Sequence, residues 1–281
     1  MAICLKVKSA LGVEMIEIKK IEDLLPKKKR DQPRRLLAVF AHPDDESLNL
    51  AGLLAKSAQE GIKTYLVCLT DGEKGVIDTK LKGSKLKKKR IRELLRASKI
   101  LGVGKVFFCH LPDGRLYYQQ QKLKNFLKEI ITQVKPGVVI THDPSGGSTH
   151  PDHIATSLTL KSLLSNYPSD EINLYFVVLG EVLKETMREI KKQKINWQMM
   201  PEPTHWLNIA SFTSIKEKAC LVYQSQKLAQ ARPVSLKVWY QLFDREYLHL
   251  VDLRKKYPFR FGKFEVNYFK FKPPSQKTIL A

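Results

Sequence analysis

The sequence has few cysteines and no long apolar run, and both shortages narrow the class of protein. Its four cysteines form no Cys-x-x-Cys pair, which argues against a disulfide framework and against a cysteine-based zinc site. No uninterrupted apolar stretch reaches the roughly 18 residues that a membrane-spanning helix needs. Because residues 1–20 also show no secretory signal, we expect a cytoplasmic protein.

Nucleotide-binding motifs are absent and acidic residues are scarce. Neither a Gly-x-Gly-x-x-Gly fingerprint nor a P-loop occurs, which argues against nucleotide chemistry. The 28 acidic residues face 49 lysines and arginines, giving a net charge of +21. Such a charge suits a nucleic acid or an anionic membrane, or it reflects lysines spread over solvated faces. Aromatic residues do not interleave with the basic runs as base stacking requires, so we expect no nucleic-acid partner.

From residue 36 onward the sequence alternates between apolar runs and amphipathic stretches. Apolar runs predict strands over 36–41, 64–70, 105–111, 138–141 and 174–179, and an edge strand over 206–209. Amphipathic spacing predicts helices over 48–60, 85–101, 123–134 and 154–164. This alternation indicates an α/β fold, with a Rossmann-like, mostly parallel sheet and helices on both faces.

The chain is interpreted as a single domain with a short preceding segment. Residues 1–35 are read as a basic N-terminal extension and residues 36–281 as the domain. The end of the domain is expected to be helical and then rich in aromatic residues, over 257–271.

Clusters of polar residues follow the predicted strands, at the points where these strands end. The clusters are His42–Glu46, Asp71–Gly75, Asp113 and His142–His153. Because the carboxyl ends of parallel strands meet at one edge of a sheet, we expect these residues to gather in one active site.

Two of these clusters have the composition of a metal site. His42 and Asp45 lie three residues apart in a turn that enters a helix, so both can face one metal ion while Asp44 points aside. A third ligand from His150–His153 would give two imidazoles and one carboxylate, a set that leaves a position for water, as catalytic zinc sites do. Asp44 could then take a proton from the attacking water, and the remaining histidine could stabilise an oxyanion. Such a set suits hydrolysis of an amide or an ester.

Each cluster also has a purely structural interpretation. The carboxylates of residues 44–46 suit the N-terminus of a helix. His142 and Asp143 either support the site from outside or serve the fold alone, and the loop 144–148 is either a lid or a connector. Three histidines belong to no motif in the sequence that would supply a matching partner, and they are treated as structural: His110, His205 and His249.

These motifs resemble the LmbE-like, or PIG-L, family of zinc de-N-acetylases, which remove acetyl from N-acetylglucosaminyl conjugates. The resemblance covers about residues 36–226. It rests on Ala-His-Pro-Asp-Asp-Glu at 41–46, Thr-Asp-Gly-Glu-x-Gly at 70–75, Arg-x-x-Glu-Leu at 90–94 with Leu-Gly at 101–102, His-Pro-Asp-His at 150–153 and Ser-Gln at 225–226.

The resemblance implies a zinc-dependent hydrolase that removes acetyl from a small N-acetylated amino-sugar conjugate. It places the zinc on His42, Asp45 and His153; iron(II) also occupies sites of two histidines and one carboxylate, so the native metal stays open. A metal-dependent amidase or esterase for another acyl group also stays open, as does a basic anion- or nucleic-acid-binding protein with a relic site. The sequence does not decide the aglycone, a peripheral contact with an anionic membrane, or homo-oligomerisation.

The resemblance also implies catalytic and substrate-binding residues. Asp44 is expected to act as the general base and to return its proton to the leaving amine. His150 is expected to stabilise the oxyanion, with Asp152 as the residue that orients it. Arg90 is expected to contact the substrate.

Overall fold

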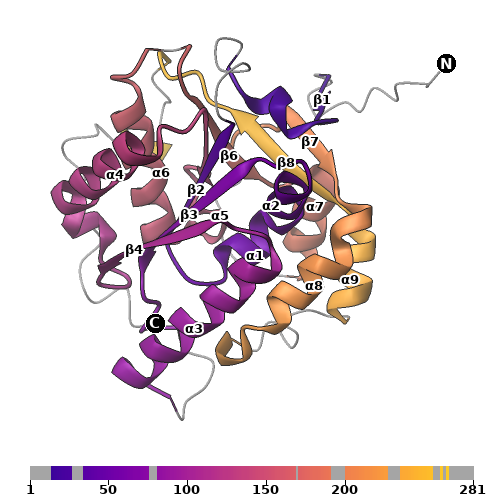
Figure 1. The fold of residues 1–281 in the computed structure, drawn as a ribbon, viewed down its shortest axis with the longest axis horizontal. Coiled ribbons are helices and arrows are strands. Elements are labelled where there is room, and N and C mark those ends of the chain that lie inside the picture. The colour runs from indigo at the N-terminus through magenta and orange to yellow at the C-terminus, as the bar shows by residue number, and fades with distance from the viewer. Residues whose placement is uncertain are drawn as a thin grey trace.

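The computed structural model describes residues 14–26, 34–75, 81–168, 170–190, 200–226 and 235–255, and the backbone of 260–261 and 264–265. In this part of the chain the main sheet has eight strands in the order β1-β7-β8-β6-β5-β2-β3-β4 (Figure 1). The strands are β1 Ile16–Glu17, β2 Arg35–Phe40, β3 Lys63–Thr70, β4 Lys105–Leu111, β5 Val138–His142, β6 Asn173–Val178, β7 His205–Asn208 and β8 Arg245–Leu250. A separate antiparallel pair joins β9 Arg260–Phe261 to β10 Phe264–Glu265.

Helices connect most of these strands. The α-helices are α1 Asp45–Asn49, α2 Ala51–Gln59, α3 Gly83–Ile100, α4 Gln120–Val134, α5 Gly146–Thr149, α6 Pro151–Leu164, α7 Glu181–Ile190, α8 Thr213–Leu221 and α9 Leu236–Leu242. The short 3-10 helices are η1 Ile21–Leu24, η3 Leu116–Gln119, η5 Ala210–Phe212 and η6 Gln224–Gln226.

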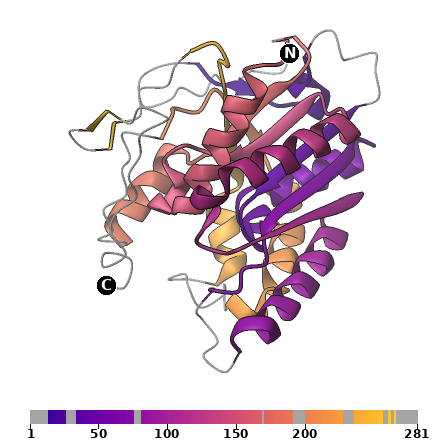
Figure 2. The same cartoon turned by 90° about the vertical axis from the view of Figure 1, so that its left-hand side faces the viewer.

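The sheet is covered on both faces because successive side chains of a strand point to opposite sides. Leu36, Ala38 and Phe40 of β2 pack with α2, α3, α8 and α9. Leu37 and Val39 of the same strand pack with α4 and α6 on the opposite face. Figure 2 shows helices on either side of the sheet. The predicted α/β fold with a mostly parallel sheet is therefore confirmed.

The five predicted parallel strands are confirmed as β2 to β6, each within one residue of its expected bounds. The edge position expected for residues 206–209 is wrong, because β7 pairs with β1 on one side and β8 on the other. β8 was not predicted and runs antiparallel to β6 and β7. Its polar residues Arg245, Glu246 and His249 hide the apolar alternation that would have revealed it.

The predicted helices are also present, with small differences at their ends. The helix expected over 48–60 is split, since α1 ends at Asn49 and α2 begins at Ala51. α3, α4 and α6 each begin two or three residues earlier than expected. None of the helices in the described ranges is long and apolar enough to cross a membrane.

Part of the predicted N-terminal extension shares the main hydrophobic core. β1 pairs with β7, and Ile18, Ile21, Leu24 and Leu25 are buried against the face covered by α2. The boundary at residue 35 stays a prediction. The aromatic-rich segment over 257–271 lies outside the described residues, apart from the backbone of β9 and β10.

Glu246 of β8 caps the start of α2 from a distant part of the sequence. Its two carboxylate oxygens accept hydrogen bonds from the backbone N–H groups of Gly52 and Leu53, each at 2.9 Å. Lys216 Nζ donates to the same carboxylate at 2.8 Å, and both charged side chains are buried. Glu246 thus satisfies free N–H groups of a helix terminus and neutralises a buried cation at the same time.

Glu246→Ala should destabilise the fold strongly, because it leaves Lys216 buried without its carboxylate and leaves the first turn of α2 uncapped. We expect the free energy of unfolding to fall by about 3–5 kcal/mol, measured by urea denaturation. The control is Glu129→Ala, an exposed residue of α4, which should change that energy by less than about 0.5 kcal/mol. Equal midpoints for the two variants would contradict this role of Glu246.

Candidate metal centre

The turn between β2 and α1 is held by its own carboxylates. Asp45 Oδ2 accepts the backbone N–H of His42 at 2.8 Å, and Glu46 Oε2 accepts that of Asp44 at 3.2 Å. Asp44 has a φ of 107°, in the left-handed region, which turns the chain sharply into α1. Asp44 is the N-cap residue of α1, but its side chain makes no capping hydrogen bond, and Asp45 and Glu46 bond to the preceding turn while their charges lie in the first turn of the helix. This arrangement does not exclude a further role for Asp45, which also faces the histidines.

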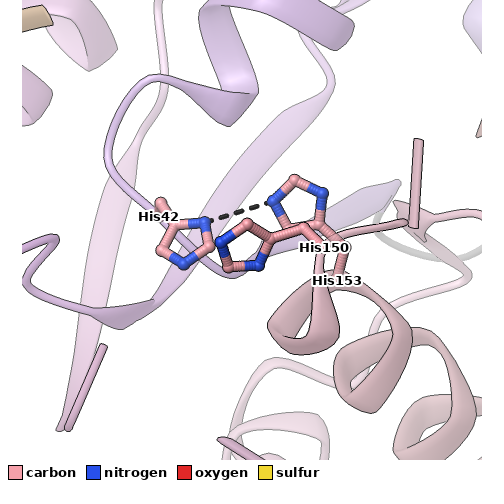
Figure 3. Close-up of side chains that lie close together, drawn as sticks. All are labelled: His42, His150 and His153. Carbon is pink, nitrogen blue, oxygen red and sulfur yellow. Dashed lines mark hydrogen bonds between the residues drawn. The ribbon is translucent and has the colours of Figure 1, made fainter. Parts of the chain in front are cut away.

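The three predicted metal ligands direct their donor atoms at one another. His42 Nδ1 lies 3.1 Å from His153 Nε2 and 3.6 Å from Asp45 Oδ2, and Asp45 Oδ1 lies 3.4 Å from His153 Nε2. Figure 3 shows the contact between the two histidines, with His150 beside them. Donor atoms held about 2.0–2.1 Å from one tetrahedral zinc ion lie roughly 3.3 Å apart. The spacing of these side chains therefore fits a single zinc ion.

The outer nitrogens of both histidines bond to acceptors, which leaves the inner nitrogens available as ligands. His42 Nε2 lies 3.1 Å from Asp113 Oδ1 and 3.2 Å from Asp152 Oδ2. His153 Nδ1 lies 3.0 Å from the carbonyl oxygen of Gly146. Carboxylate and carbonyl oxygens only accept hydrogen bonds, so each ring must carry its proton on the outer nitrogen. His42 Nδ1 and His153 Nε2 are themselves joined by a hydrogen bond of 3.1 Å, so one of the two rings carries a second proton, and loss of that proton would free both lone pairs for a metal ion.

The carboxylates around His42 favour positive charge at this position. Burial alone would lower the pKa of His42, but hydrogen bonds to Asp113, Asp152 and Asp45 hold it well above its ordinary value. Burial would raise the pKa of Asp113, but the hydrogen bond with His42 lowers it to about 2. A site that stabilises a cationic imidazole in this way also suits a bound metal cation.

His142, at the end of β5, contacts two of the predicted ligands, His153 and Asp45. Its ring stacks on that of His153 with centroids 3.7 Å apart, and its Nε2 lies 3.2 Å from Asp45 Oδ2. Three other donor sets are therefore also compact: Asp45, His142 and His153; His42, Asp113 and Asp152; and His42, His150 and His153. The backbone N–H of Ala41 donates to His142 Nε2 at 3.3 Å. Nε2 of His142 thus lies beside both the Ala41 N–H and the Asp45 carboxylate, and the Ala-His-Pro-Asp-Asp-Glu motif at 41–46 favours the set of His42, Asp45 and His153.

Asp44 is buried beside the cluster and bonded to Arg90. Arg90 Nη2 donates to Asp44 Oδ2 at 3.1 Å and to the carbonyl oxygen of Pro43, and Nη1 donates to that of Gly72 at 2.9 Å. Burial raises the pKa of Asp44 to about 6, against the opposing effect of the Arg90 charge. Arg90 itself is buried. Its terminal nitrogens thus hold the turn and Asp44, and the expected contact with substrate stays a prediction.

Two glycines of the Thr-Asp-Gly-Glu-x-Gly motif make room for Arg90. A Cβ atom at Gly72 would lie 2.3 Å from Arg90 Nη1, and one at Gly75 would lie 2.5 Å from the same atom. Gly72 also has a φ of +66°, which side chains rarely adopt. The two glycines of this motif therefore leave the space in which Arg90 packs beside Asp44.

The geometry corrects the expected partner of Asp152. We expected its carboxylate to orient His150. The carboxylate instead contacts His42 and accepts the backbone N–H groups of Gly114 at 2.7 Å and Leu116 at 3.0 Å. Only the backbone N–H of Asp152 reaches His150, donating to Nδ1 at 3.2 Å. His150 therefore carries its proton on Nε2, and its ring centroid lies 4.5 Å from that of His42.

The structure shows contacts of residues for which the sequence predicted no function. Asp113 was expected near the site but without a function, and it bonds to His42. Glu93 of α3 accepts both the backbone N–H and the hydroxyl of Ser225. Tyr223 OH donates to Glu46 Oε1 at 2.6 Å. The Arg-x-x-Glu and Ser-Gln motifs thus bond to each other, an arrangement that their separation in sequence concealed.

Comparisons with known proteins match this chain to deacetylases. The family model described as PIG-L: GlcNAc-PI de-N-acetylase matches residues 37–164. A 1D-myo-inositol 2-acetamido-2-deoxy-alpha-D-glucopyranoside deacetylase of Kineococcus radiotolerans is 32% identical over 154 residues, which cover 44% of this chain and 43% of that protein. Diacetylchitobiose deacetylase of Thermococcus kodakarensis is 26% identical over 194 residues, which cover 69% of this chain and 70% of that protein.

The solved structures extend the likeness of the fold beyond the family match. The N,N'-diacetylchitobiose deacetylase of Pyrococcus horikoshii superposes with a TM-score of 0.62 at 19% identity, covering 84% of this chain and 90% of that one. At this identity the likeness shows the fold alone. The match to the Kineococcus deacetylase spans less than half of that protein. Residues 37–164 contain both histidine clusters and Arg90, and over this part the chain matches the PIG-L, or LmbE-like, family.

Proposed function

We propose that this chain is a metal-dependent hydrolase that removes the acetyl group from an N-acetylated amino sugar. One observation carries the proposal. The donor atoms of His42, Asp45 and His153 lie 3.1 to 3.6 Å apart, with the carboxyl group of Asp44 buried beside them. The relatives' names, an acetamido-glucopyranoside deacetylase and a diacetylchitobiose deacetylase, support the acetyl group and the class of sugar.

His42, Asp45 and His153 would hold the metal ion. Zinc and iron(II) both bind two imidazoles and one carboxylate, so the donor set alone favours neither. A zinc ion held there supplies Lewis acidity, which lowers the pKa of water to about 7 and polarises a carbonyl group.

Asp44 is proposed as the group that moves the proton. Its carboxylate takes a proton from the attacking water and returns it to the leaving amine. Arg90, which donates to Asp44 Oδ2, keeps that carboxylate in place while leaving its other oxygen available. Arg90 is then a positioning residue for the base.

His150 is proposed as the hydrogen-bond donor to the amide oxygen. Because its Nδ1 accepts the backbone N–H of Asp152, its Nε2–H is the donor. A donor already placed beside His42 needs no reorganisation when negative charge develops on the oxygen. The metal ligands, the base and the oxyanion donor for hydrolysis of an amide would thus follow the ends of β2 and β5, which are neighbouring strands.

Asp113 and Asp152 are proposed to act through His42. They accept the proton of Nε2 and so keep Nδ1 as the ligand atom. Such outer carboxylates also make an imidazole a stronger ligand.

Acetate release from a panel of N-acetylglucosamine conjugates tests the proposed reaction. Chelator should abolish the release, and added zinc or iron(II) should restore it, because the site's three ligands hold the ion that supplies Lewis acidity. Protein that holds stoichiometric metal but releases no acetate from any conjugate would show that the acyl group or the sugar class is wrong.

Asp44→Asn should lower turnover by a factor of about 10²–10⁴, because the amide cannot accept the proton of water. The metal content should stay that of the wild type, since the ligands are unchanged. Asp252→Asn, in the loop after β8, is the matched control and should keep full activity. Wild-type turnover of Asp44→Asn would show that another group is the base.

Asp152→Asn should weaken metal binding by a factor of about 10–100, because His42 loses a carboxylate that fixes its tautomer. Competition with a chelator of known affinity measures this change. The role would be refuted by an unchanged affinity in a variant that circular dichroism shows to be folded.

A further inference from the structure

The outer face of α3 carries a continuous stripe of positive charge. Five of its side chains recur at spacings of three or four residues, which places them on one face of the helix. All are exposed: Lys85, Lys88, Arg92, Arg96 and Lys99. The opposite face of the same helix holds the buried Arg90 and Glu93. Figure 1 shows α3 at the periphery of the molecule, next to α8.

No carboxylate of the described residues forms an ion pair with this stripe. Glu93 is the only acidic residue of α3, and it is buried with both oxygens on Ser225. Elsewhere, an exposed lysine does find a partner, such as Lys20 with Glu22. Like charges three and four residues apart destabilise a helix. The stripe is therefore a surface whose charge lacks a partner within the described chain.

The stripe borders a hollow between α3 and the turn that follows α8. The hollow has a volume of about 380 Å³. Its charged lining consists of Lys85, Lys88, Lys89, Arg92, Arg96 and Glu93, with Leu81, Val222 and Gln224 beside them. Both oxygens of Glu93 bond to Ser225, so five cations face one carboxylate that is already bonded, and this balance suits a phosphate group.

Exposed apolar side chains flank the stripe. Leu95, three residues after Arg92, is 47% exposed. Leu221, at the end of α8 and next to Val222 of the hollow, is 49% exposed. Apolar side chains beside lysines and arginines are typical of surfaces that lie on anionic bilayers. Base stacking on a nucleic acid would need aromatic rings, and α3 has none.

We propose that the outer face of α3 docks on an anionic lipid surface. Lipid phosphates would occupy the hollow, and Leu95 and Leu221 would enter the interface beside them. The proposal does not depend on the metal centre, because Arg90, the residue of α3 that contacts Asp44, is buried and does not line the hollow.

Sedimentation with vesicles tests the docking. Wild-type protein should bind mixed phosphatidylcholine–phosphatidylglycerol vesicles and should not bind phosphatidylcholine alone. The stripe variant Lys88→Glu, Arg92→Glu, Arg96→Glu should bind the anionic vesicles at least about tenfold more weakly. The neutral variant Lys88→Gln, Arg92→Gln, Arg96→Gln makes the same test if charge reversal impairs folding, and should also bind more weakly.

The matched control reverses three exposed lysines of α4: Lys122→Glu, Lys124→Glu, Lys128→Glu. It changes the net charge by the same amount on the opposite face of the sheet, and should keep binding within about threefold of wild type. Equal losses in the two triple variants would overturn the proposal in favour of overall charge. Absence of wild-type binding to anionic vesicles would overturn it as well. So would a stripe variant that loses binding to duplex DNA while its vesicle binding stays unchanged.

Discussion

The candidate metal centre depends on the buried imidazole of His42, whose two nitrogens bond to different partners. Asp113 and Asp152 accept the proton of His42 Nε2, so that Nδ1 faces Asp45 and His153. Asp152 also accepts backbone N–H groups from the loop that follows β4, and it thereby joins that loop to α6. A buried carboxylate is tolerated only where hydrogen bonds and opposite charge compensate its desolvation. His42 therefore orders the ends of neighbouring strands as well as the metal centre.

A second set of buried polar contacts ties α3 to this centre. Arg90 and Glu93 leave the same face of α3, one toward Asp44 and the other toward Ser225. Glu46, in the turn after β2, reaches Tyr223 beside that serine. The family motifs thus lie in one connected network, even though only some of them belong to the metal site. The inner face of α3 fixes this helix in the fold, and its outer face carries positive charge that has no ion-pair partner among the described residues, from which lipid docking is inferred.

The sequence predicted the parts of the fold that depend on local pattern. Strands β2, β3, β5 and β6 are almost entirely buried, and β4 at the edge of the sheet is apolar over most of its length, so their apolar runs are continuous and easily read. β8 escaped prediction because Glu246 is polar yet buried, serving as a helix cap for α2. Convergence of His42, Asp45 and His153 followed from topology, since parallel strands end at one edge. The partners of Asp152 and Arg90 depend on side-chain direction and loop path, which short motifs do not contain.

The central claim is that His42 binds metal through Nδ1 because two carboxylates hold its Nε2–H. Anomalous diffraction at the zinc edge, from crystals of the zinc-loaded protein, tests this directly. The account predicts one peak bonded to His42 Nδ1, Asp45 and His153 Nε2, with Nε2 of His42 still on Asp113 and Asp152. A peak bonded instead to His42 Nε2, Asp113 and Asp152, or to His142 in place of His42, would contradict it.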